Sequence, residues 1–138
     1  MNYWLAKSEP FKYSWDRFVG DGHAVWDGVR NYLARNNLRA MKVGDQVLFY
    51  HSNEGLAIVG IAEVVKEAYQ DPTTEDTNWV VVELVPVKRL ATPITLVQIK
   101  ADAVCCEMEL VRQSRLSVSR VTEGQFHRVL VLSGTEVE

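Results

Sequence analysis

A β-hairpin signal in the middle of the chain constrains the fold more than any other feature. Residues 46–51 (QVLFYH) form a run with apolar and aromatic side chains. The polar turn 52–55 (SNEG) separates this run from a second one at residues 57–66. A third β region is expected at residues 79–90, after the acidic and polar segment 69–78, which is typical of a loop. The sequence therefore predicts a sheet at the centre of the fold.

Short helices are expected both before and after the three central β segments along the chain. A capped helical turn is predicted over residues 14–19, and a second helix over roughly residues 31–41. Capping-box spacing at residues 95–98 and 122–125 predicts two more helices, and Gly134 is a stop signal for the last one. Each of these helices is short.

The remaining signals define the class of fold. Two further strands are predicted at residues 3–7 and 116–119. Pro86 cannot donate a ladder hydrogen bond, so its strand is predicted to lie at an edge or to carry a bulge. The elements lack a regular βαβ alternation. We therefore expect one α+β domain over residues 1–138, with a strongly curved sheet or partial barrel flanked by short helices.

Composition excludes several classes of protein. With 138 residues, of which 47% are hydrophobic, the chain is long enough to bury a core without disulfides or metals. Cys105 and Cys106 are adjacent, no CxxC motif occurs, and the three histidines are scattered, so we expect neither a metal nor a cofactor. No apolar run is long enough to span a membrane, and the N-terminal residues reach mixed charge too early for a signal peptide. We expect a cytoplasmic protein without membrane association.

Polar residues follow or precede several of the predicted strands. They occur at residues 7–10 (KSEP), 51–53 (HSN) and 112–115 (RQSR), and residues 26–31 (WDGVRN) join an aromatic ring to hydrogen-bonding groups. If these strand ends converge, they form an aromatic-walled pocket that suits a planar ligand with a polar edge, such as a nucleobase. The alternative is that Ser and Asn only form turns, and that the tryptophans belong to the core.

Six runs of the sequence resemble one known family. They are residues 3–10 (YWLAKSEP), 13–16 (YSWD), 26–32 (WDGVRNY) with 34–36 (ARN), 49–53 (FYHSN), 59–64 (VGIAEV) and 112–118 (RQSRLSV). They cover nearly the whole chain in order. On these runs the chain resembles an EVE domain, and is similar to bacterial EVE proteins and to the thymocyte nuclear protein family.

The resemblance implies a PUA-like fold, which is a curved β pseudo-barrel flanked by short helices. It also implies a module that binds a modified nucleobase in DNA or RNA, because EVE domains are related to the YTH readers of N6-methyladenine and to ASCH domains. In YTH domains a Lys-Ser segment and a tryptophan help to form the cage around the base. Lys7, Ser8 and Trp26 match these positions, and Ser52 and Asn53 match a neighbouring turn.

The resemblance and the pocket pattern together give a set of candidate residues. The candidate ligand-binding residues are Lys7, Ser8, Trp26, Arg30, Asn31, His51, Ser52, Asn53 and Ser114. Trp26 is expected to stack on the base, and the Ser and Asn side chains are expected to read its edge. The candidate phosphate contacts are Arg35, Arg39, Arg112 and Arg115, together with Arg30. A Trp26→Ala variant is expected to lose binding and to stay folded.

Two other functions remain open at the level of the sequence. Some ASCH relatives are amidohydrolases that act on acylated nucleosides, and Lys7, Ser8 and Glu63 supply the residue types that such an enzyme uses. The third possibility is a pocket for a free small nucleotide or anion. Oligonucleotide binding that weakens with salt would distinguish a nucleic-acid partner from this last class, since a free nucleotide releases few counterions.

The formal net charge of −3 limits how a nucleic acid can be bound. Residues 30–42 contain four basic residues and no acid, and residues 112–120 contain three and none. The acids concentrate elsewhere, at residues 63–76 and 102–109 and at the C-terminal Glu136 and Glu138. We therefore expect weak nonspecific binding, with affinity that depends on the pocket and on a local basic rim.

Overall fold

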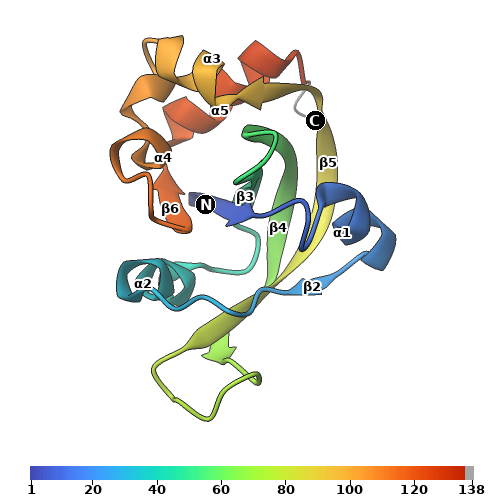
Figure 1. Cartoon of the computed structure of the whole chain (residues 1–138), viewed down its shortest axis with the longest axis vertical. Helices are drawn as coiled ribbons and strands as arrows, with labels where there is room; N and C mark the ends of the chain where they lie inside the picture. Colours follow the sequence, from blue (N-terminus) through green and yellow to red (C-terminus); the bar gives the residue numbers. More distant parts are fainter. Residues whose placement is uncertain (136–138) are drawn as a thin grey trace.

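Six strands form one open mixed sheet at the centre of the protein (Figure 1). The computed structural model describes residues 1–135, so the acidic residues Glu136 and Glu138 lie outside the described part of the chain. The strands are β1 (Tyr3–Ser8), β2 (Ala24–Val25), β3 (Gln46–His51), β4 (Ala57–Gln70), β5 (Val80–Thr95) and β6 (Val118–Val121). The helices are α1 (Trp15–Asp21), α2 (Tyr32–Ala40), α3 (Leu96–Ala101), α4 (Glu109–Arg112) and α5 (Glu123–Ser133), with a 3-10 turn η1 at Cys105–Glu107.

The strand order is β2-β5-β4-β3-β1-β6. β3, β4 and β5 form an antiparallel meander, while β1 lies parallel to β3 and antiparallel to β6. Among residues 1–135, β2 pairs with β5 and β6 pairs with β1, and the two outer strands do not pair with each other. The α+β class is confirmed, but the expected pseudo-barrel is not closed, because the short outer strands end the ladder on each side.

The curvature comes mainly from the long hairpin of β4 and β5. Their register shifts at four places, and each irregularity bends the strands and increases their twist. Pro86 lies opposite Ala62 at one of these shifts, which confirms the prediction of a bulged strand. Both strands extend beyond the predicted ends, and the loop between them runs from Asp71 to Trp79.

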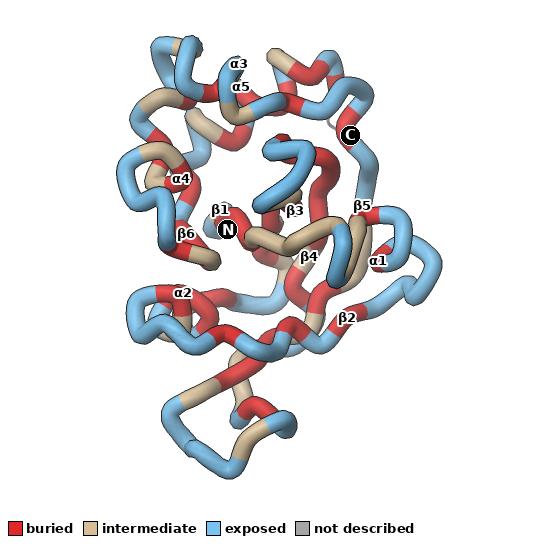
Figure 2. Tube along the Cα trace, viewed as in Figure 1, coloured by how far each residue is buried: buried red, intermediate tan, exposed pale blue. Residues whose placement is uncertain are grey.

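The sheet has a buried layer on each face. Successive residues of one strand belong to different layers, so that Trp4 packs with Phe49 and Trp15 while Leu5 packs with Leu48 and Phe126. Helices α1 and α2 cover the first face, and α3, α4 and α5 cover the second (Figures 1 and 2). Because both faces are covered, the central part of the sheet is continuously apolar at residues 3–6 of β1, 47–50 of β3 and 57–62 of β4. The end of β4 and the strands β5 and β6 also carry charged residues.

The helix boundaries follow the capping signals. Side chains of Ser14, Thr95 and Thr122 accept hydrogen bonds from the first turns of α1, α3 and α5, as predicted. The strand predicted at residues 116–119 starts only at Val118, because α4 and the turn after it occupy the preceding residues.

Neither a cluster of metal-ligating side chains nor a membrane-spanning helix is present in residues 1–135. Cys105 and Cys106 are free thiols, and no group of three or more His, Cys, Asp or Glu side chains in residues 1–135 is arranged to hold a metal ion. None of the helices in this range has the length and apolarity that a membrane crossing requires.

Candidate functional site

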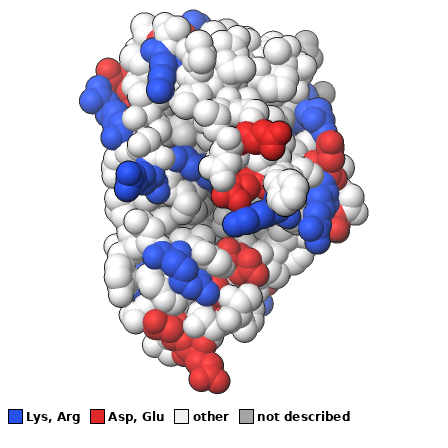
Figure 3. All heavy atoms as spheres, in the orientation of Figure 1, with Lys and Arg blue, Asp and Glu red and all other residues white. Residues whose placement is uncertain are grey.

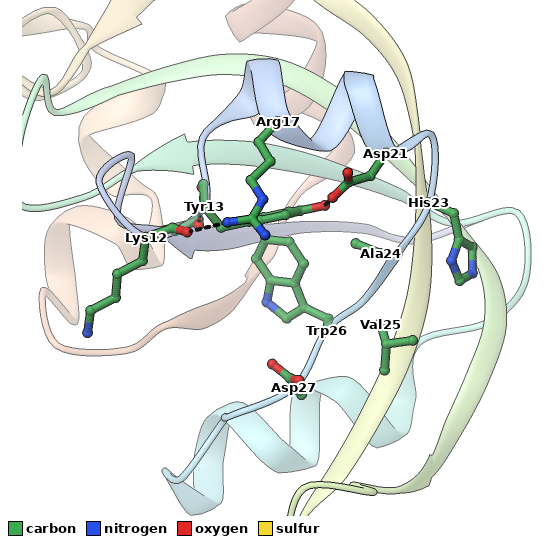
Figure 4. Close-up of a pocket in the computed structure, with 10 residues that line it drawn as sticks. Lys12, Tyr13, Arg17, Asp21, His23, Ala24, Val25, Trp26 and Asp27 are labelled. Atoms are coloured by element: carbon green, nitrogen blue, oxygen red, sulfur yellow. Dashed lines mark hydrogen bonds between the residues drawn. The ribbon is translucent and has the colours of Figure 1, made fainter.

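A cavity of about 500 Å³ lies beside α1 and β2, at the end of β1 (Figure 4). It is lined by Ser8, Lys12, Tyr13, Arg17, Asp21, His23, Ala24, Val25, Trp26 and Asp27. Figure 4 shows that Tyr13, Arg17 and Asp21 approach from the α1 side, whereas Trp26 and Asp27 come from the segment after β2. The cavity therefore combines one indole wall with several charged and polar groups.

Trp26 is fixed in place by its neighbours. Its side chain is 9% exposed, and its backbone N–H donates to the Val82 carbonyl at 2.8 Å. The indole meets the rings of Tyr13 and Phe49 edge to face, with centroid distances of 6.4 and 5.6 Å. An aromatic wall held in this way is preorganised for stacking.

Tyr13 and Asp21 close the side of the cavity next to α1. The Tyr13 hydroxyl donates to Asp21 Oδ2 at 3.1 Å, and the Arg17 guanidinium lies 5.5 Å from the centre of the Tyr13 ring. Burial and the Asp21 carboxylate raise the pKa of Tyr13 to about 12, so its hydroxyl stays protonated at neutral pH. Neither Tyr13 nor Asp21 was identified as a candidate from the sequence.

The side chains of Lys7 and Ser8 form hydrogen bonds with two different segments of the chain. Ser8 Oγ donates to the Tyr13 carbonyl at 2.6 Å and holds the turn that carries Tyr13. Lys7 Nζ donates to the Ser114 carbonyl at 2.7 Å, and burial lowers the pKa of this amine. These consecutive residues therefore connect the cavity to the segment before β6.

A second hollow, of about 390 Å³, lies between the start of α2 and the segment before β6. It is lined by Asn31, Leu33, Arg112, Gln113, Ser114, Arg115 and Leu116. Asn31 Oδ1 accepts from the Ala34 N–H at 3.0 Å and caps α2, which leaves its amide nitrogen for another partner. The structure therefore divides the predicted candidates between two hollows, with Ser8 and Trp26 in one and Asn31 and Ser114 in the other.

His51, Ser52 and Asn53 line neither of these two hollows. His51 Nε2 accepts from the Trp15 N–H at 3.1 Å, and burial lowers the pKa of the imidazole. The Ser52 N–H donates to the Ser8 carbonyl at 2.9 Å, and Asn53 Nδ2 donates to Glu9 at 2.6 Å. These contacts hold the turn between β1 and α1 in place.

Arg30 is held by a buried carboxylate. Its Nη1 lies 2.9 Å from Asp71 Oδ2, and the guanidinium lies 5.7 Å from the centre of the Trp79 ring. Asp71 is fully buried and also accepts from the N–H groups of Gly28 and Thr73, at 3.0 and 2.7 Å. Burial opposes ionisation of Asp71, but these hydrogen bonds outweigh that effect and lower its pKa to about 2.

The other candidate arginines differ in their freedom to contact phosphate. Arg35 donates to Asn36 and to the Asn78 carbonyl and lies 4.9 Å from the centre of the Tyr32 ring, so its charge is not neutralised by these partners. Arg112 forms an exposed ion pair with Glu107. Arg39 and Arg115 are exposed, and neither has an ion pair with a carboxylate in residues 1–135.

The chain is similar in sequence and structure to proteins of one known family. The EVE domain family model matches residues 2–132. The chain belongs to the EVE domain family. Thymocyte nuclear protein 1 of Mus musculus is 36% identical over 169 aligned residues, which cover 98% of this chain and 75% of the relative.

Solved EVE structures superimpose on the whole sheet and its helices. A protein from Agrobacterium tumefaciens is 46% identical and has a TM-score of 0.96, with coverage of 98% of this chain and 94% of the other. Human THYN1, in complex with 5-methylcytosine containing DNA, is 32% identical with a TM-score of 0.90, covering 99% and 100%. A YTH domain from Zygosaccharomyces rouxii, 14% identical with a TM-score of 0.61, shares the fold.

The three residues suggested for an amidohydrolase do not converge in this EVE domain. Lys7 pairs with Tyr50, whereas Glu63 pairs with Gln46, which in turn pairs with Tyr3. The two side chains are therefore four residues apart along the sheet, roughly 13 Å at the rise of a β-strand. A Lys–Ser–Glu centre is not formed.

Asp71 is a fully buried residue of this EVE domain that the sequence pattern missed and that binds both Gly28 and Arg30. It lies in the acidic and polar segment 69–78, which the sequence predicts only as a loop. The Asx-turn spacing of Asp71 and Thr73 is the one local signal that was available. Its contacts with Gly28 and Arg30 join residues 43 and 41 positions apart, so no local sequence pattern can predict them.

Proposed function

We propose that this EVE domain binds a modified base presented by a nucleic acid strand, with 5-methylcytosine in DNA as the first candidate. The observation that carries the proposal is the complex of human THYN1 with 5-methylcytosine containing DNA, because that structure covers 99% of this chain at 32% identity. The cavity beside Trp26 is the site that we assign to the base.

The residues of the cavity suit a methylated cytosine. Stacking of a base on an aromatic side chain such as Trp26 contributes about 1–3 kcal/mol. Ala24 and Val25 offer apolar contacts to a methyl group, and the Asp27 carboxylate can accept from an exocyclic amino group. The ring face, the methyl group and the exocyclic amino group thus each have a partner of matching chemistry.

Binding within a strand requires that the base leaves its stack. Extrusion costs a few kcal/mol from a duplex and less from a single strand, and stacking on Trp26 offsets part of that cost. Arg35, Arg39 and Arg115 are the candidates that remain free to contact phosphates. Because the net charge is −3, we expect affinity to depend on the modified base rather than on the backbone alone.

The direct test is a titration of the protein with matched ligands. Fluorescence anisotropy with single strands and duplexes that carry one 5-methylcytosine, N6-methyladenine or unmodified base should show preference for one modification. Salt should weaken strand binding much more than binding of the free nucleoside. Equal affinity for every modified and unmodified strand would overturn the proposal.

A variant of Trp26 links the binding to the cavity. Because Trp26 is buried, Trp26→Ala is expected to destabilise the fold by about 3 kcal/mol or more, so a loss of binding by that variant would not isolate the stacking role. Trp26→Phe keeps an apolar ring and is the better variant. It should bind the modified strand several-fold more weakly while its thermal unfolding and circular dichroism remain close to wild type.

A further inference from the structure

Phe11 is exposed beside the cavity, which is unusual for a phenylalanine. Its side chain is 93% exposed, more than any other large hydrophobic residue in the described part of the chain. It lies between β1 and α1 and directly precedes Lys12 and Tyr13, which both line the cavity. The phenyl ring is therefore exposed to solvent on the same segment that supplies part of the cavity wall.

The turn that carries Phe11 is held firmly. The N–H groups of Lys12 and Tyr13 both donate to the Glu9 carbonyl, at 2.9 and 2.8 Å. The Glu9 carboxylate is contacted by Asn53 Nδ2 at 2.6 Å and by Lys12 Nζ at 3.2 Å. Because the backbone is fixed on both sides, Phe11 is displayed at a defined position.

The surroundings of Phe11 suit a polyanion. Arg17 donates to the Lys12 carbonyl and has no carboxylate partner within ion-pair distance among residues 1–135. Of the nearby acids, Glu9 pairs with Lys12 and Asp16 pairs with Arg89, while Asp21 accepts a hydrogen bond from the Tyr13 hydroxyl. Asp27 lines the cavity from the segment after β2, so the negative charge that remains lies inside the cavity rather than on the turn that carries Phe11. Figure 3 shows Lys and Arg side chains on both sides of this face, with Asp and Glu side chains between them near its centre.

We infer that Phe11 is a wedge that enters the base stack of a duplex next to the extruded base. This inference rests on the proposed function. Removal of a base into the cavity leaves a gap in the stack. Apolar side chains such as Phe insert between base steps in other DNA-binding proteins, and Phe11 can occupy this gap in the same way. An exposed ring on a rigid turn next to the cavity, with an unpaired guanidinium nearby for the phosphates, has the properties that this role requires.

The experiment compares three forms of the same modified base. Wild type, Phe11→Ser and Phe11→Trp are titrated with the free 5-methylcytosine nucleoside, a single strand and a duplex that each carry this one modification. Phe11→Ser should weaken duplex binding about tenfold or more and leave nucleoside binding within about twofold, whereas Phe11→Trp should retain duplex binding. The matched control is Val97→Ser, which removes another exposed apolar side chain (78% exposed) from the far helical layer and should change none of these affinities.

A fluorescent base reports the insertion itself. With 2-aminopurine next to the modified base, wild type should change the fluorescence of the duplex on binding, and saturating Phe11→Ser should change it much less. Equal duplex affinity and equal fluorescence for wild type and Phe11→Ser would overturn the wedge and leave the proposed function intact. A loss of nucleoside binding as large as the loss of duplex binding would make Phe11 part of the cavity wall, which also overturns it. If wild type binds no modified ligand, the proposed function and the wedge both fail.

Discussion

The six-membered ring of Trp15 lies directly against the backbone of Gly60. A Cβ atom built on residue 60 would lie 2.5 Å from the Trp15 ring, closer than any real packing contact. Trp15 is 2% exposed and also packs edge to face against Phe49, at a centroid distance of 5.3 Å. This contact joins the first residue of α1 to the middle of β4, and α1 in turn forms one side of the candidate cavity.

Gly60→Ala should therefore destabilise the protein. The added methyl group meets the large, enclosed Trp15 ring rather than the end of a flexible side chain, so overpacking of about 1–3 kcal/mol is expected. Urea denaturation monitored by tryptophan fluorescence measures this change. Gly124→Ala is the control, because no atom lies within 4 Å of the new Cβ and the site is in the first turn of α5. That variant should be neutral or slightly stabilising, and an equal loss in both variants would contradict the role of the Trp15 contact.

Asp71 should make stability depend on pH in the acid range. Its pKa is about 2 in the folded protein, below the ordinary value of 3.8, so the unfolded chain takes up this proton first as the pH falls. The contribution of Asp71 is complete above pH 3.8 and disappears as the pH falls toward about 2. Asp71→Asn should lower stability at neutral pH by about 2 kcal/mol and flatten the acid part of the curve. Urea midpoints for the two proteins at several pH values test this, and parallel curves would contradict it.

Asn31 offers a way to separate capping from base recognition. Serine caps helices about as well as asparagine, so Asn31→Ser should leave the stability within about 0.5 kcal/mol of wild type. It removes the side-chain amide nitrogen that Asn31 can offer to a ligand. Because Asn31 lines the second hollow and not the cavity that we assign to the base, affinity for the free modified nucleoside should stay within about twofold of wild type at unchanged melting temperature. A loss of nucleoside binding of about tenfold would show that the base enters the hollow beside Asn31 instead.

The two thiols should differ in reactivity. Cys105 is fully buried, and burial together with the neighbouring Asp102 carboxylate raises its pKa to about 12, whereas Cys106 is only partly buried. A thiol reagent at mildly alkaline pH should modify at most one cysteine in the native protein and both in denaturant. Cys106→Ser should abolish the native reaction. Rapid modification of Cys105 in the folded state would show that α3 and η1 open readily.

Part of the site was predictable because its signals are local. The motif around Trp26 marked a residue that lines the cavity, and Asn31 was correctly placed next to a helix start. For other candidates, the sequence indicated the residue but not its hydrogen-bond partner. His51 accepts from the backbone of Trp15, 36 residues away, and Asn53 donates to Glu9, 44 residues away, and neither contact can be seen in a local pattern.

The sequence by itself determined the types of the main elements, their caps and the family of the fold. Caps and turns depend on residues two to four positions apart, as Thr95 and Gln98 or Thr122 and Gln125 illustrate. Caps and turns can therefore be predicted from short segments of the sequence. Only the tertiary structure decided that the sheet stays open, that the candidate residues divide between two hollows, and that Asp71 organises Gly28 and Arg30. These outcomes depend on strand order and register, because a contact such as that between Lys7 and Ser114, 107 residues apart, exists only when β1 and β6 lie side by side.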